Sequence, residues 1–217
     1  MKKTILYTFI VLVSVGFLSA IWLTLKHKND PNYYPDGWVD LGLSVKWESK
    51  NLGVNSPEQA GELVKWIILG PLSEYETRDS ITIYAGLDNT ASGSGQVITN
   101  MDRPAGWGLP TSDEFNELIE KCSWQWTELD GVKGYRITSN VPGYTNRSIF
   151  LPAAGYRNPD NNEVNDYGIT GAYWTGSRTG NDSGCCLIFD STHQFVDNRS
   201  LSSGLCLRLV KSRNKAK

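Results

Sequence analysis

An uninterrupted apolar segment near the N-terminus constrains this chain more than any other feature. Residues 5–25 (ILYTFIVLVSVGFLSAIWLTL) carry no charged side chain over 21 consecutive positions. As an α-helix this segment would extend about 31 Å, which matches the hydrocarbon thickness of a bilayer. The segment therefore predicts a single transmembrane helix that anchors whatever follows it.

A cleaved signal peptide is the main alternative to an anchor, because Lys2 and Lys3 precede the apolar segment. A signal peptide usually has an apolar region of about 7–15 residues that ends at a small-x-small cleavage site. Here Leu18 stands two residues before the small Ala20, and the apolar run continues beyond that point. A lipoprotein signal would need cysteine where Ile21 stands. We therefore expect an uncleaved signal anchor.

The charges that flank the apolar segment bear on its orientation. Lys2 and Lys3 lie on one side, and Lys26 and Lys28 lie on the other. Short lysine-bearing N-terminal tails usually stay inside, and Trp22 would then lie at the outer interface, where indole rings are favoured. We expect a single-pass cell-membrane protein whose domain is on the periplasmic or extracellular side. Its expected parts are the anchor with its flanks (1–28), a linker (29–37), a globular domain (38–210) and a basic tail (211–217).

Charge excludes one class of partner. The whole chain has 21 basic and 23 acidic side chains, and four of the lysines precede residue 29, so 17 basic groups face 23 acidic groups in the exported part. Nucleic-acid binding needs a basic surface that replaces counterions. The one basic cluster is the C-terminal tail of Lys211, Arg213, Lys215 and Lys217, and we expect it to be a frayed, solvated end. We therefore expect no nucleic-acid partner.

Alternation of apolar and polar residues predicts a strand near each end of the domain. In Trp38–Trp47 (WVDLGLSVKW) the alternate residues Val39, Leu41, Leu43 and Val45 would share one buried face with the final Trp47. In GLCLRLV the residues Leu205, Leu207 and Leu209 alternate in the same way. Since terminal strands often pair, we expect these two segments to be neighbours.

One helix and several further strands are predicted between these ends. The helix covers Ser112–Lys121, because Thr111 and Glu114 form a capping-box pattern, and its buried stripe would be Phe115, Leu118 and Ile119. A second helix is expected over 57–66, after which the chain consists of strands and long polar loops. The expected strands are 135–138, 148–151, 172–175 and 186–189, and the expected loops are 155–171, 176–184 and 190–204. With 21 glycines and eight tryptophans, this pattern indicates an α+β domain that is mostly antiparallel β with one clear helix.

Seven motifs in order resemble those of a known family. They are WVDLGLSVKW, GWGLPTSDEFNEL, CSWQW, GVKGYRITS, SIFLPAAGYRN, GAYWTGS and GLCLRLV, and together they cover about residues 38–210. The chain resembles the Fibrobacter succinogenes major paralogous domain family of surface proteins from Bacteroidetes-like bacteria, although Gly108 stands where that family usually has arginine. The resemblance implies a C-type-lectin-like fold, in which the terminal strands pair and a helix packs behind a twisted sheet. It also implies a binding or structural module and names no ligand.

The same fold includes enzymes, so the chemistry of the chain needs its own test. GWGLPTSDEF is also similar to formylglycine-generating enzymes, whose paired cysteines hold copper for an oxidation. Here Cys206 stands alone in its segment, and the adjacent Cys185 and Cys186 would point to opposite faces of a strand. His193, which lies between Asp190 and Asp197, is the one histidine beyond the anchor region, and its loop context favours plain exposure. We therefore expect no catalytic residues and no enzyme.

The sequence alone leaves open whether the cysteines form disulfides and whether the domain binds calcium. Four cysteines allow three sets of two disulfides, and Cys122 at the end of the helix could reach Cys186 or Cys206. The alternative is that all four are buried small hydrophobic side chains. Residues 158–163 (NPDNNE) supply oxygen atoms that suit Ca²⁺, but they match no fixed calcium pattern, so a polar turn is favoured over a cofactor or metal site.

Recognition by the long loops of the C-terminal half is the function that these observations favour. Loops held on a rigid scaffold commonly carry binding residues, and these loops contain aromatic rings and forked hydrogen-bond donors. The candidate ligand-binding residues are Tyr156, Arg157, Asn161, Tyr167, Arg178, Asn181, Gln194 and Arg199. The chain is thus expected to be a non-enzymatic binding module for a glycan or a protein. A structural or assembly subunit of the cell envelope is the alternative, and a lectin-fold oxidase of the formylglycine-generating type is the third.

The remaining large aromatic residues have a different expected role. We expect Trp38, Trp47, Trp124, Trp126 and Trp174 to build the core, because tryptophans in alternating strand segments usually face inward.

Overall fold

The computed structural model describes residues 34, 36–65, 82–85, 96–99, 107–179 and 182–213. Asp36–Lys217 form one compact unit, separate from Met1–Pro35. The expected anchor over 5–25, most of the linker, Asn181, Lys215 and Lys217 lie outside the described residues. Within the described residues, no helix has the length and apolarity that a membrane crossing requires.

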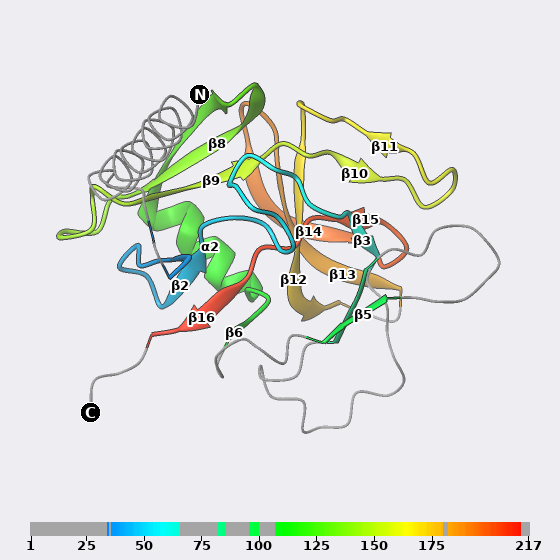
Figure 1. Ribbon diagram of the computed structural model, residues 1–217, viewed down its shortest axis with the longest axis horizontal. Helices are drawn as coiled ribbons and strands as arrows, with labels where there is room; N and C mark the ends of the chain where they lie inside the picture. The colour runs from blue at the N-terminus through cyan, green and yellow to red at the C-terminus, as the bar shows by residue number, and fades with distance from the viewer. Residues whose placement is uncertain are drawn as a thin grey trace, which may run out of the picture. The chain divides into compact units, whose positions relative to one another are not determined.

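The described domain is mostly antiparallel β with one helix, as expected for the fold class. Figure 1 shows helix α2 (Ser112–Lys121) among strands from both halves of the chain. Two sheets are meanders of three strands each. The first consists of β7 (Cys122–Leu129), β8 (Val132–Ser139) and β9 (Ser148–Pro152), and the second of β12 (Gly171–Arg178), β13 (Ser183–Phe189) and β14 (Gln194–Ser200). Four strands predicted from the sequence lie inside β8, β9, β12 and β13, so those predictions are confirmed.

The N-terminal alternating segment is a hairpin and not the single strand that its pattern predicts. Strand β1 (Trp38–Val39) pairs antiparallel with β2 (Val45–Glu48), with Trp38 opposite Glu48. The reversal occurs because Asp40 Oδ1 accepts a hydrogen bond from Gly42 N at 3.0 Å and Gly42 has a φ of 77°. All five alternating residues are buried nonetheless, so the pattern identified the core residues but not their backbone path.

The two ends of the domain are neighbours, as predicted. Strand β16 (Val210–Ser212) pairs antiparallel with β2 on one side and with β6 (Trp107–Gly108) on the other. The predicted strand through Leu207 and Leu209 is wrong, because only β15 (Gly204–Leu205) and β16 are strands there. Between them, Leu207 O accepts from Leu52 N and Leu209 O accepts from Glu48 N, each at 2.9 Å. This part of the backbone therefore bonds to the loop after β2 and to β2 itself.

Arg208 holds that irregular segment from inside the core. Its side chain is fully buried, and its guanidinium donates three hydrogen bonds at 2.7–2.9 Å to Asn51 Oδ1, Glu48 O and Phe150 O. Burial lowers the pKa of Arg208, and Tyr173 and Glu48 oppose this effect. Arg208 thereby ties the N-terminal hairpin and β9 to the C-terminal segment.

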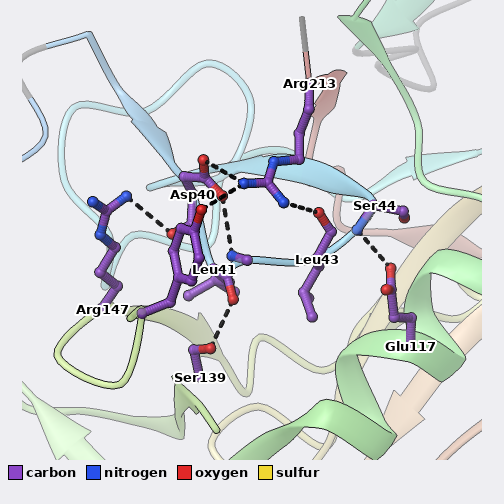
Figure 2. Close-up of polar contacts among 10 residues, drawn as sticks. Asp40, Leu41, Leu43, Ser44, Glu117, Ser139, Arg147 and Arg213 are labelled. Atoms are coloured by element: carbon purple, nitrogen blue, oxygen red, sulfur yellow. Dashed lines mark hydrogen bonds and ion pairs between the residues drawn. The ribbon is translucent and has the colours of Figure 1, made fainter. Parts of the chain in front are cut away.

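The basic tail is partly ordered, which corrects the expectation of a frayed end. Lys211 lies in β16 with Nζ 4.7 Å from the centre of the Trp38 ring. Figure 2 shows Arg213 against the turn between β1 and β2, where it donates to Leu43 O and to Asp40 Oδ2. Arg213 also donates to Tyr144 Oη at 2.7 Å. The same turn accepts two further hydrogen bonds, from the Arg147 guanidinium to Asp40 O and from the Ser139 hydroxyl to Leu41 O, and its Ser44 N donates to Glu117 Oε2, as Figure 2 shows.

We expect Arg213→Ala to destabilise the domain by about 1–2 kcal/mol, because two half-buried acceptors and an ion pair with Asp40 lose their donor. Denaturant unfolding of the full-length chain would measure this loss. Lys133→Ala, at an exposed position of β8, is the control and should change the free energy of unfolding by less than about 0.5 kcal/mol. Equal effects of the two substitutions would contradict the role given to Arg213.

The predicted helix is confirmed with its capping box. Thr111 Oγ1 accepts from Glu114 N at 3.2 Å, and Glu114 Oε2 accepts from Thr111 N at 2.8 Å. Phe115 and Leu118 are buried, and Ile119 is half-buried. The helix contacts β12, β13 and β14, so it covers one face of that sheet.

The second predicted helix, over 57–66, is wrong for its described residues. Gly61 has a φ of 73°, which an α-helix excludes, and Ala60 O accepts from Asn51 Nδ2 at 2.8 Å. Strand β3 (Val64–Lys65) follows and pairs with β15. Strands β4 (Thr82–Ala85) and β5 (Gln96–Thr99) pair with each other.

Aromatic side chains fill the core, but not all the tryptophans are fully inside. Trp38, Trp47 and Trp174 are buried as expected. Trp124 and Trp126 are half-buried, because they lie on β7 and pack edge-on against Tyr135 from one side of the sheet. Phe189 completes this cluster.

Candidate functional site

The loop predicted over 155–171 contains a short hairpin, and four of the eight candidate residues lie in this region. Strand β10 (Tyr156–Arg157) pairs antiparallel with β11 (Val164–Asn165), and Figure 1 shows the two strands side by side. We call residues 155–170 the β10–β11 hairpin region. Its sheet continues through β15 to β3, so the hairpin is fixed to the body of the domain by backbone pairing.

The connecting turn at 158–163 is closed by its own hydrogen bonds. Asn158 N donates to Glu163 O at 2.8 Å, and Asn158 Oδ1 accepts from Asp160 N at 2.8 Å. Asn161 Oδ1 accepts from Glu163 N, and its Nδ2 donates to Glu163 Oε2. Asn162 has a φ of 60°, as asparagine in a tight turn often does. The amide oxygens that suit Ca²⁺ are thus used as acceptors of backbone N–H groups, which agrees with the polar turn favoured from the sequence.

The two faces of the hairpin have different roles. Directly paired residues lie on the same face of an antiparallel sheet. Tyr156 therefore faces the core with Leu205 and Val64, against which it packs. Arg157 lies on the opposite, outer face with its partner Val164. The hairpin thus has one face for attachment and one face open to solvent.

Three large apolar side chains are exposed along this region. Val164 is 44% exposed, Tyr167 is 59% exposed and Ile169 is 61% exposed, although residues of these types usually lie inside. All three fall within six consecutive residues. We call Val164, Tyr167 and Ile169 the hairpin face.

Backbone hydrogen bonds hold the hairpin face in place. Asp166 has a φ of 57°, and its carbonyl accepts from Ile169 N and Thr170 N. Gly168 N donates to Ala153 O at 2.7 Å, and Gly155 N donates to Thr170 O at 2.7 Å. Tyr167 and Ile169 therefore project from an ordered turn, so their exposure needs no rearrangement of the chain.

Acidic and amide groups flank the hairpin-face residues along the chain. The exposed polar residues of its two turns are Asp160, Asn161, Glu163 and Asp166. Asn162 and Asn165 lie in the same region and are half-buried. The nearest basic side chain of the region, Arg157, donates from Nη1 to Asn162 O at 2.8 Å. The exposed apolar side chains of the hairpin face thus alternate along the chain with exposed carboxylates and amides.

The structure brings five of the eight candidate residues together. Tyr156, Arg157, Asn161 and Tyr167 belong to the hairpin region, and the Arg199 guanidinium lies 4.9 Å from the centre of the Tyr156 ring. Tyr156 is engaged by Arg199 and by the core, and Asn161 is engaged by Glu163. Tyr167 is the candidate whose ring is most open to a ligand.

The other three candidate residues are Arg178, Asn181 and Gln194. Gln194 and Arg199 lie on β14, where the sequence predicted a loop over 190–204. They are at opposite ends of that strand, about 16 Å apart at 3.3 Å per residue. Arg178 is placed by its backbone, opposite Gly184 in β13, and Asn181 lies outside the described residues.

Sequence reasoning missed Val164 and Ile169. Each is a single aliphatic residue in a polar stretch, and such a residue is normally assumed to be buried. The available signal was their position between Asn, Asp and Gly residues in NEVNDYGITG, where turns leave little backbone to bury a side chain.

The four cysteines are free, and three of them are buried. Burial raises the pKa of Cys186 and of Cys206 to about 12, and that of Cys122 likewise to about 12. Cys185 points away from Cys186, as predicted, and its thiol lies 3.4 Å from Asn198 Oδ1. A thiol with a raised pKa stays protonated near neutral pH, which lowers its reactivity as a nucleophile.

His193 is exposed in the turn between β13 and β14, in line with the expectation. Its neighbour Asp190 accepts hydrogen bonds from Thr192 Oγ1, Thr192 N and His193 N, which lower the pKa of Asp190 to about 2. Asp197 lies on β14 and is exposed. These contacts are those of a hairpin turn closed by an aspartate.

The hairpin face is therefore the surface of the described domain that most clearly departs from ordinary surface composition. It joins exposed apolar side chains, an ordered backbone and neighbouring carboxylates in one segment. Comparison with known protein families, with curated proteins and with solved structures finds no match to this chain.

Proposed function

We propose that this chain is a non-enzymatic binding module that recognises its ligand through the hairpin face. The single observation that carries the proposal is the exposure of Val164, Tyr167 and Ile169 on a hydrogen-bonded turn. Clustered exposed apolar side chains mark interaction sites in soluble domains, and a rigid backbone reduces the entropy that binding costs.

A protein surface is the ligand class that this face fits best. Val164 and Ile169 are aliphatic, and aliphatic side chains contribute to binding when an apolar partner surface excludes water from them. The neighbouring carboxylates would then lie at the rim of the interface, where polar groups remain partly hydrated. A basic border on the partner would complement them.

A glycan is the second candidate, and Tyr167 favours it. An exposed tyrosine ring provides an apolar surface with a polar tip, and the neighbouring amide and carboxylate groups supply hydrogen-bond partners for hydroxyl groups. In this case the ring would carry the binding and the two aliphatic residues would not.

The proposal includes a location and a fold. Residues 5–25 would hold the module in the cell membrane with the domain on the periplasmic or extracellular side. The domain would have the C-type-lectin-like fold of the major paralogous domain family, which the pairing of the terminal strands β2 and β16 and the helix behind a sheet support. The buried, protonated state of Cys186 and Cys206 argues against the oxidase alternative.

The test separates the two ligand classes with two variants of the full-length chain in mild detergent. One variant carries Val164→Ser with Ile169→Ser, and the other carries Tyr167→Ala. Each is probed on a glycan array, with calcium and with chelator, and for retention of cell-envelope proteins. All these positions are exposed, so thermal unfolding should stay close to that of the natural chain.

For a protein ligand we expect a blank glycan array and one envelope protein whose binding falls at least tenfold in the aliphatic variant. A glycan signal that Tyr167→Ala removes and the aliphatic variant leaves intact would instead establish a lectin. Binding of an envelope protein at equal strength by all three chains would contradict the proposed face.

A further inference from the structure

Strand β14 is a long, regular edge strand. It is the outer strand of the β12–β13–β14 sheet, and its seven residues pair with β13 without a register shift. Natural edge strands are usually protected by short length, bulges, proline or lysine. The sequence of β14, QFVDNRS, contains neither proline nor lysine, and Phe195 in it is 45% exposed.

Two hydrogen bonds at the ends of β14 define which of its backbone groups point outward. Asp190 N donates to His193 O just before β14, and Leu201 N donates to Asp182 O just after it. Because bonded and non-bonded pairs alternate along an antiparallel ladder, the odd-numbered residues of β14 bond to β13. The N–H and C=O groups of Gln194, Val196, Asn198 and Ser200 therefore point to the open edge. Within the described residues no second strand pairs with this edge, and of these groups the Ser200 carbonyl accepts a hydrogen bond from Ser203 N at 2.9 Å.

The charged residues of β14 make this edge complementary to itself. Asp197 and Arg199 are two positions apart, so both side chains lie on the same face of the strand. If a second β14 pairs antiparallel with Asn198 at the twofold axis, Asp197 of each copy lies opposite Arg199 of the other. This register also places Val196 opposite Ser200, and the outward-pointing N–H and C=O groups of the two Asn198 residues meet each other at the axis.

The neighbouring registers do not place Asp197 of one copy opposite Arg199 of the other. A twofold axis at Asp197 would place the two Asp197 carboxylates opposite each other, and like charges in that position are destabilising. Shifting one copy of β14 by an odd number of residues along the other would place inward-pointing backbone groups opposite outward-pointing ones. In the register centred on Asn198, the Asp197–Arg199 pairs are the non-hydrogen-bonded ones, in which side chains approach most closely.

A contact within each copy restricts the position of Arg199, which favours its pairing with Asp197 of the second copy. Its guanidinium is stacked 4.9 Å from the centre of the Tyr156 ring, which limits the rotamers that it can adopt. Asn198 Oδ1 is held by the Thr179 hydroxyl at 2.6 Å, which fixes the residue at the axis.

We propose that two copies of this chain associate through β14, edge to edge and antiparallel, in a twofold dimer with reciprocal Asp197–Arg199 pairs. Strand β14 contains none of the hairpin-face residues, so a dimer would present two such faces. Association through an edge strand follows the same backbone chemistry as strand addition in peptide recognition.

The test is a charge reversal measured by sedimentation velocity on the full-length chain in detergent. Asp197→Arg and Arg199→Asp, each alone, should weaken dimerisation by about tenfold or more, because each places like charges opposite each other twice. A mixture of these two variants restores opposite charges at both pairs and should dimerise. The double variant Asp197→Arg with Arg199→Asp should also dimerise.

Two controls keep the outcome specific. Glu128→Arg makes the same charge change on exposed β7 and should leave dimerisation unchanged. The Val164→Ser and Ile169→Ser variant should dimerise like the natural chain, so loss of ligand binding and loss of dimerisation are distinguishable. A monomeric natural chain, or single variants that dimerise as well as the natural chain, would overturn the proposal.

Discussion

Replacing Arg208 with methionine is expected to lower the free energy of unfolding by about 3–5 kcal/mol. The substitution leaves Asn51 Oδ1, Glu48 O and Phe150 O without their donor inside a core that water does not reach. For a domain of this size, such a loss corresponds to a fall in Tm of roughly 10–15 °C. Thermal and denaturant unfolding of the full-length chain would measure it.

Two companion variants show whether hydrogen bonding is the cause. Arg208→Lys keeps the charge but offers one ammonium group in place of a planar fork, so we expect it to recover only part of the stability. Arg136→Met alters a half-buried arginine on β8 and should change stability by less than about 0.5 kcal/mol. If Arg208→Met unfolded like Arg136→Met, the buried guanidinium would not be what joins the N-terminal hairpin to β9.

The second large effect is expected at Gly155, where the hairpin region begins. A Cβ atom there would lie 2.0 Å from Asn165 O and 2.9 Å from Tyr167 N, and Gly155 has a φ of 69°. Gly155→Ala must therefore displace the backbone of β11 and of the turn after it. We expect a loss of about 3 kcal/mol, with strain and displacement both contributing.

Gly37→Ala is the matched control for this prediction. Gly37 has a φ of 73° and no heavy atom within 4 Å of its added Cβ, so the substitution introduces similar strain without a clash. Hydrogen-exchange protection should fall across 164–170 in Gly155→Ala and stay unchanged there in Gly37→Ala. Equal stability of the two variants would show that the hairpin is not fixed through Gly155.

The core residues and the helix could be predicted because their signals are local. Thr111 and Glu114 define the start of α2, and the alternation from Val39 to Trp47 identifies side chains that are buried. The backbone path of the same residues could not be predicted. Gly42 and Asp40 turn the chain within the alternating pattern, and a hairpin buries the same side chains as a straight strand.

The strand predicted for the C-terminal segment was wrong for a different reason. Alternation from Leu205 to Leu209 is what a strand would show, but Arg208 is inserted into the core and the carbonyls around it bond to other segments. A buried arginine depends on acceptors from Glu48, Asn51 and Phe150, which are distant in sequence. Long-range partners of this kind leave no periodic signal.

The candidate site was predicted in part. The sequence indicated the 155–171 region and Tyr167, because polar loops with aromatic residues commonly bind ligands. It also grouped Gln194 with Arg199, which β14 separates along its length. The prediction missed Val164 and Ile169, since exposure of an aliphatic residue depends on which neighbours the fold supplies.

Site-specific photo-crosslinking in intact cells tests the central claim most directly. A photoreactive amino acid is introduced in place of Tyr167 in the hairpin face and, in a separate chain, in place of exposed Glu128 on β7. If the hairpin face binds the ligand, irradiation yields a discrete adduct from position 167 and none from position 128. Adducts of equal yield from both positions, or an adduct from position 128 alone, would contradict the assignment of the hairpin as the binding face.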